Sequence, residues 1–390
     1  LKDASATAIF GSRASNCVII ITTKKCAKTV SDVPQIHFDF QTSVSHVSNY
    51  VDVMDAPTYK AFVNSQVEAG RLNSEVLASL GNANTNWQKE IYQLAQTYEG
   101  NLSLAGRVMM GKVGTLPYRV SGGYLSQEGV LMTDLMNRGT VSLNLSPSFL
   151  DDHLTIQLNG KGVFTDNNFA NQGAIGAAVR MNPTHPVYDD SANGLNGFFV
   201  HRGADGKVNT IAVQNPVALI MEKTDRSNAA RFIGNAQIDY KVHGLEALRF
   251  NLNLGLDWSK SNGYDGVNPG SFQAYKDTTI LKDEAGNVTN NARGWGQYNK
   301  NYAVRRNQVL DFYGNYNETW GKHNLDAMIG YSWQNFYQND QSFSYFNETG
   351  DRNTNNQSLL YQEESFLVSF YGRINYSFDS RYLLTFTLRA

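Results

Sequence analysis

Long segments in which apolar and polar residues alternate are the feature that most constrains the fold of this chain. In the clearest one, from Phe250 to Trp258, Phe, Leu and Trp occupy every second position, with Asn, Gly and Asp between them. A period of two places successive side chains on opposite faces of an extended strand and does not suit a helix. The pattern recurs at 141–145, 154–158 and 366–378. The sequence therefore predicts an all-β protein.

The alternating segments predict about eleven antiparallel strands, several of them unusually long. We expect them at residues 36–45, 97–109, 115–128, 134–146, 152–166, 228–242, 246–260, 302–319, 322–340, 362–378 and 381–390. Many would have about 13 to 19 residues, whereas strands of soluble sheets average about five to six. Long strands that are apolar on one face suit a tilted wall that crosses a lipid bilayer and extends beyond it.

The predicted connections differ in length between the two ends of the sheet. Those after the first, fifth and seventh strands have about fifty, sixty and forty residues, and those after even-numbered strands are short. The short ones include 146–151, 243–244, 321–322 and 379–380. Outer-membrane barrels have this asymmetry, with short periplasmic turns and long external loops.

Aromatic residues near the predicted strand ends support the same interpretation. We expect Trp258 and Trp333 to end strands near the outer rim, and Tyr240, Trp320 and Phe378 to end strands near the inner rim. Aromatic girdles mark the two interfaces of a membrane barrel, although the aromatic residues of an ordinary core would give a similar pattern.

The composition is compatible with a membrane barrel and argues against nucleic acid as a partner. The net charge is −2 and no basic stripe stands out, whereas nucleic-acid-binding domains carry basic patches. The mean hydropathy is −0.40, and no apolar stretch reaches the roughly eighteen residues of a membrane-spanning helix. Alternating barrel strands also average to a polar value, so hydropathy does not separate a soluble protein from a barrel.

The first 26 residues follow a different pattern from the rest of the chain. Residues 1–10 are Ala-rich and helix-permissive, and a β-branched run then ends at Lys24 and Lys25. A continuous apolar run of this length suits a strand covered on both faces. The run consists of Val18, Ile19, Ile20, Ile21, Thr22 and Thr23.

Several phrases of the sequence resemble the SusC/RagA group of TonB-dependent outer-membrane transporters. LKDASATAIFGSRASN at 1–16, followed by VIIITTKK, is similar to the last stretch of their plug domain. NTNWQKEIYQ at 84–93 and YRVSGGYLSQEGVL at 118–131 fit the same group. The resemblance implies the end of a plug domain at 1–26, a linker at 27–35, and the first half of an outer-membrane β-barrel at 36–390. About eleven of roughly 22 strands would be present, with two open edges.

The resemblance also implies a function. A whole protein of this group would import an oligomeric nutrient, either a glycan or an oligopeptide, across the outer membrane. A SusD-like lipoprotein would cover the outer loops, and a TonB complex would pull on a region that precedes Leu1. Two alternatives remain open from the residues alone: a passive porin, and a soluble or surface-attached β-rich adhesin or carbohydrate-binding protein.

Cys17 and Cys26 are the only cysteines. Along an extended strand their Cα atoms would stand roughly 30 Å apart, too far for a disulfide unless the chain reverses sharply within the Ile run. Two sulfurs without a nearby His do not predict a zinc site. Members of the resembling group usually have Gly at both positions, so the two cysteines bear on how the plug segment packs.

No arrangement of residues predicts catalysis, a metal site or a cofactor, so we expect a protein that is not an enzyme. The seven His residues lack metal-ligand spacing, and no phosphate loop, nucleophile elbow or CxxC motif occurs. We expect most of the His residues at the surface or in turns. The segment 283–287 lacks the alternating carboxylates of a calcium loop, and it and 204–207 are interpreted as hairpin turns.

The first long loop is predicted to contain a short helix. Asp55 would cap it, Pro57 suits its first turn, and one face would carry Tyr59, Phe62, Val63 and Val67. This helix would either pack on the other outer loops or contact a partner lipoprotein.

Aromatic and amide side chains in the outer loops are candidates for contact with a neutral polar substrate. Packing between loops would use the same residue types. The substrate-contact candidates are Phe198, Phe199, Trp295 and Tyr298. By alternation, six polar residues should face the lumen and hold the plug by hydrogen bonds: Asn251, Asn253, Asp257, Tyr371, Arg373 and Asn375.

Overall fold

The computed structural model describes residues 33–203, 205–268, 270–274, 280–282, 288–290, 297–345 and 359–390. The predicted plug strand Val18–Thr23, the two cysteines, Trp295 and the predicted turn at 283–287 lie outside the described residues. The division of the chain at residues 26 and 35 stays a prediction.

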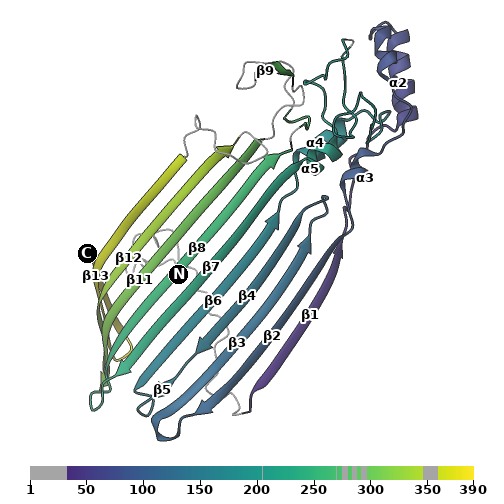
Figure 1. Ribbon diagram of the computed structural model, residues 1–390. Coiled ribbons are helices and arrows are strands. Elements are labelled where there is room, and N and C mark those ends of the chain that lie inside the picture. The colour runs from purple at the N-terminus through teal and green to yellow at the C-terminus, as the bar shows by residue number, and fades with distance from the viewer. Residues whose placement is uncertain are drawn as a thin grey trace.

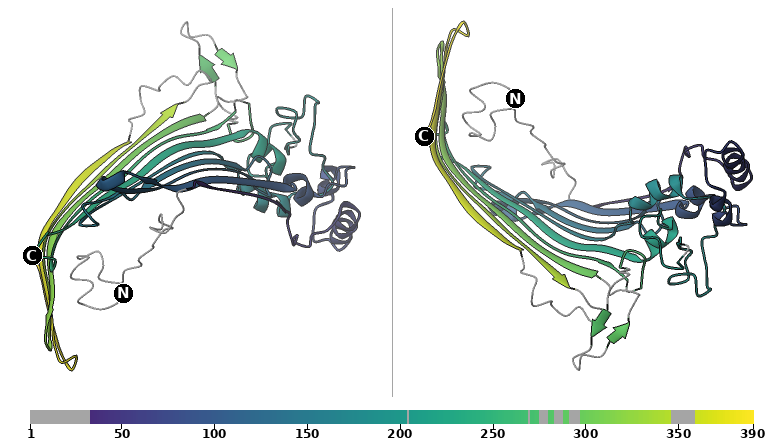
Figure 2. Two further views of the ribbon diagram at one scale, coloured as in Figure 1. Left: turned by 90° about the horizontal axis from the view of Figure 1, so that it is seen from below. Right: turned by 90° about the horizontal axis from the view of Figure 1, so that it is seen from above.

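One curved antiparallel sheet forms the body of the molecule (Figure 1). Eleven strands follow one another in chain order, each hydrogen-bonded to the next. They are β1 (Gln35–Ser45), β2 (Ala95–Met109), β3 (Gly114–Glu128), β4 (Leu135–Leu145), β6 (Leu154–Asn168), β7 (Lys223–Lys241), β8 (Leu248–Val267), β11 (Gln297–Trp320), β12 (His323–Tyr345), β13 (Leu359–Phe378) and β14 (Tyr382–Arg389). Figure 2 shows that the sheet bends into an open trough. The predicted strand order and the all-β class are confirmed.

Three further strands are very short. β5 (Ser148–Phe149) pairs with β3 and β6, and β9 (Ile280–Lys282) pairs with β10 (Val288–Asn290) outside the main sheet. Among the described residues, β1 and β14 are each paired on one side only. All of β1 is exposed, as expected for an edge strand.

The connections sort into a turn end and a loop end of the sheet. The turn end holds 110–113, 146–153, 242–247, 321–322 and 379–381. The loop end holds 46–94, 129–134, 169–222 and the described residues of the connection that follows β8. The predicted alternation of long and short connections is confirmed, because successive antiparallel strands return the chain to the same end every second time.

All helices of four or more residues lie at the loop end (Figure 1), as far as the chain is described. They are α2 (Ala56–Glu68), the 3-10 helix η2 (Ser74–Ser79), α3 (Trp87–Ile91), α4 (Gly173–Arg180) and α5 (Pro216–Met221). A single 3-10 turn, η3 (Gly111–Val113), lies at the turn end. None of the described helices combines the length and hydropathy needed to cross a membrane.

The helix predicted in the first loop is confirmed as α2. The Asp55 carboxylate accepts a hydrogen bond from the Thr58 amide at 2.9 Å, as an N-cap residue does. Val63 is buried, whereas Phe62 is 46% exposed. Of the four residues predicted to share one face of the helix, Val63 is thus buried and Phe62 is not.

Several strands extend further toward the loop end than the alternation predicts. β7 begins at Lys223 instead of 228, β8 continues to Val267 instead of 260, and β12 continues to Tyr345 instead of 340. Backbone pairing continues through these extensions, but polar residues occupy both faces of β8 beyond Trp258. The alternation of apolar and polar residues therefore ends before the strand ends.

One face of the sheet is apolar and the other is polar. The strand register aligns apolar residues with apolar residues on neighbouring strands, so each face continues from strand to strand. Leu252 and Leu254 on β8 lie level with Phe312 and Leu310 on β11, and the face formed by such positions is called the outward face below. Its side chains are widely exposed, for example Phe312 at 46% and Leu254 at 40%. The segment from Phe250 to Trp258 has about nine residues, the length that a tilted strand needs to cross a bilayer.

Two of the predicted girdle residues do not end strands. Tyr240, Trp320 and Phe378 lie at or next to strand ends as expected, but Trp258 and Trp333 lie well inside β8 and β12. The strands project beyond these tryptophans, so the aromatic position marks the end of the apolar surface and not the end of the strand.

A charge on the outward face should destabilise the full-length protein in lipid. We expect Leu254→Lys to lower the free energy of unfolding by about 2–4 kcal/mol, because the ammonium would have to enter hydrocarbon. Gln237→Lys is the matched control, since Gln237 pairs with the neighbouring Asn253 on the opposite face. Chemical unfolding in lipid vesicles measures both, and an equal cost for the two variants would contradict the assignment of the faces.

Candidate functional site

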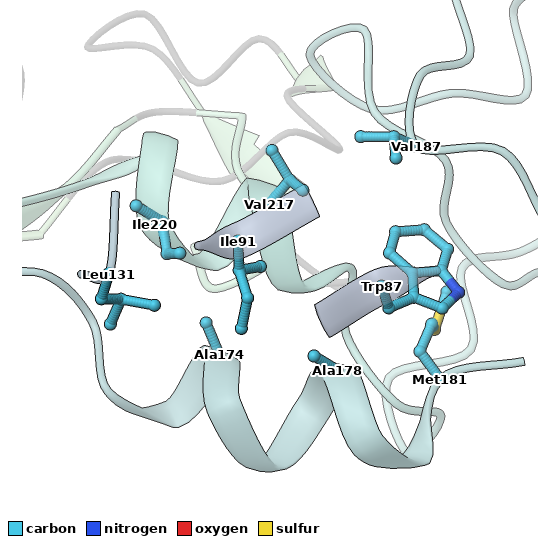
Figure 3. Close-up of a cluster of buried hydrophobic side chains, with 9 residues drawn as sticks. All are labelled: Trp87, Ile91, Leu131, Ala174, Ala178, Met181, Val187, Val217 and Ile220. Atoms are coloured by element: carbon cyan, nitrogen blue, oxygen red, sulfur yellow. The ribbon is translucent and has the colours of Figure 1, made fainter. Parts of the chain in front are cut away.

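The candidate functional site is the group of loops 46–94, 129–134 and 169–222, called the loop cap below. The larger hydrophobic core of the loop cap (Figure 3) receives side chains from all three loops, and a smaller cluster of Leu195, Val200 and Val208 lies within 169–222. The core consists of Trp87, Ile91, Leu131, Ala174, Ala178, Met181, Val187, Val217 and Ile220. Because each loop supplies only part of this core, the loops depend on one another for their conformation.

Small side chains let the short helices of the loop cap approach closely. Ala174 and Ala178 are buried on the face of α4 that is turned toward Ile91 and Trp87 of α3 (Figure 3). α5 packs on the same pair of helices and contributes Ile220, which is 1% exposed. Helices as short as these are not stable alone, so this shared packing holds them.

Hydrogen bonds join the first loop to the third. The Gly81 amide donates to Thr184 Oγ1 and the Trp87 indole Nε1 donates to the carbonyl oxygen of Asn182, both at 2.9 Å. A Cβ atom on Gly81 would lie 2.2 Å from the carbonyl oxygen of Thr184, so this approach requires glycine. These bonds satisfy buried polar groups at the point where the two loops meet.

An open groove of about 530 Å³ lies beside this contact and is called the cap groove below. Residues 52–55 and Tyr59 line one side, and residues 178–183 line the other. The Gln88 side chain holds the backbone of Val51, which precedes the groove lining, since it accepts from the Val51 amide at 2.9 Å and donates to the Val51 carbonyl at 2.7 Å. Val53 and Met54 are 42% and 44% exposed, which leaves apolar surface at the groove edge.

Two His residues form an aromatic stack with Phe199. The rings of His185 and Phe199 stack at 4.2 Å, and His201 meets both edge-on at 5.0 and 5.2 Å. Burial lowers the pKa of His185 to about 4, with a smaller effect of the His201 charge, and burial also lowers the pKa of His201. Both imidazoles are thus neutral at neutral pH and pack as apolar rings. His185 lies at the end of a turn, as expected for most of the His residues, but it is buried there.

The inner face of the sheet carries polar side chains that bond to one another across strands. Arg231 donates to both carboxylate oxygens of Asp257 at 2.9 and 2.7 Å, and Asn235 donates to Asn253. Arg373 lies 3.8 Å from Asp326. The register confirms the inner position of the set predicted to face the lumen: Asn251, Asn253, Asp257, Tyr371, Arg373 and Asn375. A surface of amides and neutralised charges suits a water-filled passage.

The structure separates the residues predicted to contact substrate. Phe198 and Phe199 are half-buried and pack against the core of the loop cap. Tyr298 lies on the outward face of β11, where its ring stacks on that of Tyr264 at 5.5 Å. Trp295 lies outside the described residues. Contact of these four residues with a substrate stays a prediction.

Asn215 is a structural residue that the sequence reasoning missed. It is 3% exposed, caps α5 by accepting from the Val217 amide at 3.1 Å, and donates to the Val187 carbonyl at 2.8 Å. The dipeptide Asn215-Pro216 is a helix-start signal and would have revealed α5. The predicted turn near 206 is present, with an isolated bridge between Arg202 and Val208 and a positive φ at Gly206.

The whole chain is similar to curated TonB-dependent receptors. It is 36% identical to the TonB-dependent receptor SusC of Bacteroides thetaiotaomicron and 31% identical to the TonB-dependent receptor P3 of Formosa agariphila. Both matches cover 100% of this chain, but only 37% and 36% of the relatives. The chain thus spans about a third of the length of these proteins. No family model matches it.

Solved structures show the same fold. The RagAB peptide transporter matches with a TM-score of 0.71 at 19% identity, and its closed-closed state with a TM-score of 0.73 at 18% identity. Both matches cover 100% of this chain and 45% of the solved chain.

Register, facial polarity and fold together define the sheet as part of the wall of an outer-membrane β-barrel. With the sequence similarity over its whole length, the chain belongs to the SusC/RagA family of TonB-dependent receptors. The resemblance carried by residues 1–16, 84–93 and 118–131 is confirmed.

Truncating the central tryptophan should open the loop cap and leave the sheet intact. We expect Trp87→Ala to cost about 3–5 kcal/mol of local stability, because a large buried side chain and its bond to Asn182 are lost. Limited proteolysis of the full-length protein should then cut within 46–94 and 169–222. Ile211→Ala is the control, since Ile211 is 94% exposed, and equal protection of both variants would contradict the assigned core.

The His stack should make the loop cap sensitive to acid. The folded cap keeps His185 neutral down to about pH 4, whereas the unfolded loop binds a proton once the pH falls below about 6.5. The unfolded form thus binds more protons, and cap stability should fall as the pH decreases from 6.5 to 4 and then level off. Hydrogen exchange within 169–222 measures this opening. His185→Gln should flatten the dependence, and His153→Gln, at the turn end, should leave it unchanged.

Proposed function

We propose that these residues belong to an importer that carries an oligomeric nutrient across the outer membrane in a TonB-dependent manner. The observation that best supports this proposal is the pairing of an apolar outward face with a polar inner face over strands of up to 24 residues. Such a wall spans a bilayer and encloses a polar passage. The relatives with full coverage of this chain are TonB-dependent receptors.

The proposed substrate is a glycan or an oligopeptide. Amide side chains on the inner face, such as Asn235, Asn251 and Asn253, both donate and accept hydrogen bonds and carry no charge. Most charged residues on this face are paired, for example Arg231 with Asp257. A passage lined in this way favours neutral polar chains over ions. The solved relative RagAB is a peptide transporter, and this supports the peptide alternative only by analogy.

The proposed partner is a SusD-like lipoprotein that docks on the loop cap. The cap groove and the exposed side chains of Val53 and Met54 supply a concave, partly apolar surface at the loop end. Exposed apolar surface rimmed by polar residues is typical of a protein-binding site. The TonB complex would act through the plug domain, of which residues 1–26 are the proposed end.

Uptake by the full-length receptor tests the proposed import. In cells that express it, accumulation of a labelled glycan or peptide pool should stop when the proton gradient is dissipated, because the gradient powers the TonB complex. A passive porin would continue to equilibrate its substrate. Electrophoresis in detergent tests the second alternative. A soluble or surface-attached adhesin or carbohydrate-binding protein would not show the heat-dependent shift in migration that a barrel shows.

Substitutions at the cap groove test the proposed partner. Val53→Asp together with Met54→Asp should reduce copurification of the lipoprotein by about tenfold, because two carboxylates would be desolvated in the interface. Val113→Asp is the control, since Val113 is 62% exposed but lies at the turn end. Unchanged copurification by the double variant would overturn the proposed docking surface.

A further inference from the structure

Two connections at the turn end, 146–153 and 242–247, are joined through one carboxylate. They lie next to each other because the first leads into β6 and the second leaves β7, and these two strands are paired. His153 Nε2 lies 2.7 Å from Glu246 Oε1, and Lys241 Nζ lies 2.7 Å from Glu246 Oε2. The amide of Lys241 also donates to the carbonyl oxygen of His153 at 2.7 Å. Glu246 therefore ties the end of the first connection to the second.

The backbone of the first connection is held in an unfavourable conformation. Leu150, Asp151 and Asp152 have φ angles of 57°, 54° and 67°. The left-handed region is unfavourable for residues with a Cβ atom, so three such residues in succession need contacts that hold them. His153 supplies two of these contacts, since its amide donates to the Leu150 carbonyl oxygen at 3.0 Å and its Nδ1 lies 2.9 Å from the same oxygen. A hydrogen bond from Ser148 to the Asp152 carboxylate supplies another.

Both ring nitrogens of His153 face oxygen atoms that only accept hydrogen bonds. Nδ1 faces the Leu150 carbonyl, and Nε2 faces the Glu246 carboxylate. A neutral imidazole donates through one nitrogen only, so one of the two contacts would set a lone pair against an oxygen. An imidazolium donates through both nitrogens. The arrangement is therefore complete only when His153 is protonated.

The charged groups around His153 favour the protonated ring. The hydrogen bond to Glu246 raises the pKa of His153 above its usual value of 6.5, the Leu150 carbonyl adds to this effect, and the charge of Lys241 opposes it. Hydrogen bonds from Lys241 and His153 hold the pKa of Glu246 at about 2, so this carboxylate stays charged. His243 stacks face to face on His153 at 3.8 Å. The ring edge of His153 thus stays available for the two contacts.

We propose that protonated His153 is a latch that fixes the connection 146–153 to the connection 242–247. With the proton in place, His153 bridges Leu150 and Glu246 and keeps the left-handed turn closed. Once the proton leaves, one of the two contacts becomes repulsive and the turn relaxes. β5 lies in this turn and pairs with Gly114 and Thr115 of β3, so release also detaches the turn from the neighbouring hairpin. This conformational switch goes beyond the proposed import and needs neither substrate nor partner.

The latch should hold in mild acid and open in alkali. The pKa of His153 is higher in the closed turn than in the released chain, so the closed turn binds more protons above pH 6.5. Its stabilising effect is therefore fully present below pH 6.5 and is lost as the pH rises through the pKa of His153 in the closed turn. The loop cap should show the opposite trend, because burial lowers the pKa of His185.

Hydrogen exchange of the full-length receptor in detergent, between about pH 6 and about pH 9, tests the latch. After correction for the intrinsic exchange rate, amide protection within 146–153 should fall by about threefold or more over this range, while protection of β6 and β7 stays constant. Exchange of the imidazole Cε1 hydrogens identifies the group that titrates, and we expect His153. Titration of His243 alone, or constant protection of 146–153, would overturn the proposal.

A substitution of the carboxylate tests the same contact. Glu246→Gln keeps the size of the side chain but removes the charge that holds the proton. We expect it to lower the protection of 146–153 at pH 6 to the level of the unmodified protein at pH 9, and to abolish the pH dependence. Asp379→Asn is the matched control, since it removes a carboxylate that pairs with Lys322 at the same end of the sheet. Equal loss of the pH dependence in both variants would contradict the latch, and the imidazole measurement decides the matter if Glu246→Gln does not fold.

Discussion

The structure depends on an uninterrupted ladder of backbone hydrogen bonds between neighbouring strands. In hydrocarbon no water is present to satisfy a free amide or carbonyl, so a wall of this kind exists only when every strand pairs with the next. The ladder runs from β1 to β14 in chain order, with the 23 residue pairs of β11 and β12 forming its longest unbroken section. The register of the ladder then determines which side chains face outward, because a shift of one residue would exchange the outward and inner faces of a strand.

The loop cap is stabilised differently, by contacts between side chains and not by a ladder of backbone hydrogen bonds. Its helices are too short to persist alone, and they are held by a shared apolar core and by single bonds such as that between Trp87 and Asn182. The sheet and the loop cap are therefore expected to unfold separately. Loss of one core side chain can release the loops while the sheet keeps its pairing.

The wall was predictable from the sequence because its pattern is local. Alternation over Phe250 to Trp258 fixes both the strand and the face, and the predicted inner position of Asn251 and Asp257 followed directly. The strand ends beyond Trp258 were not predictable, since polar residues on both faces carry no period. Most of the packing within the loop cap was not predictable from the sequence either. Burial of His185 depends on Phe199 and His201. The spacing of residues along the sequence does not predict a contact between separate turns of a loop. Within the loop cap, sequence signals exist for α2, for the turn near Gly206 and for the Asn215-Pro216 start of α5.

The strands that project beyond the apolar surface have a consequence for how such receptors diversify. Between Phe250 and Trp258, each outward position of β8 must stay apolar, so few substitutions are tolerated. From Lys260 to Val267 the same strand keeps its pairing with β7 and β11 but no longer meets hydrocarbon. Sequence can therefore drift in the projecting segment without loss of insertion. β8 thus joins a segment that must stay apolar to a segment that is free of this constraint, and changes in the attached loop can be accommodated in the second segment while the first stays unchanged.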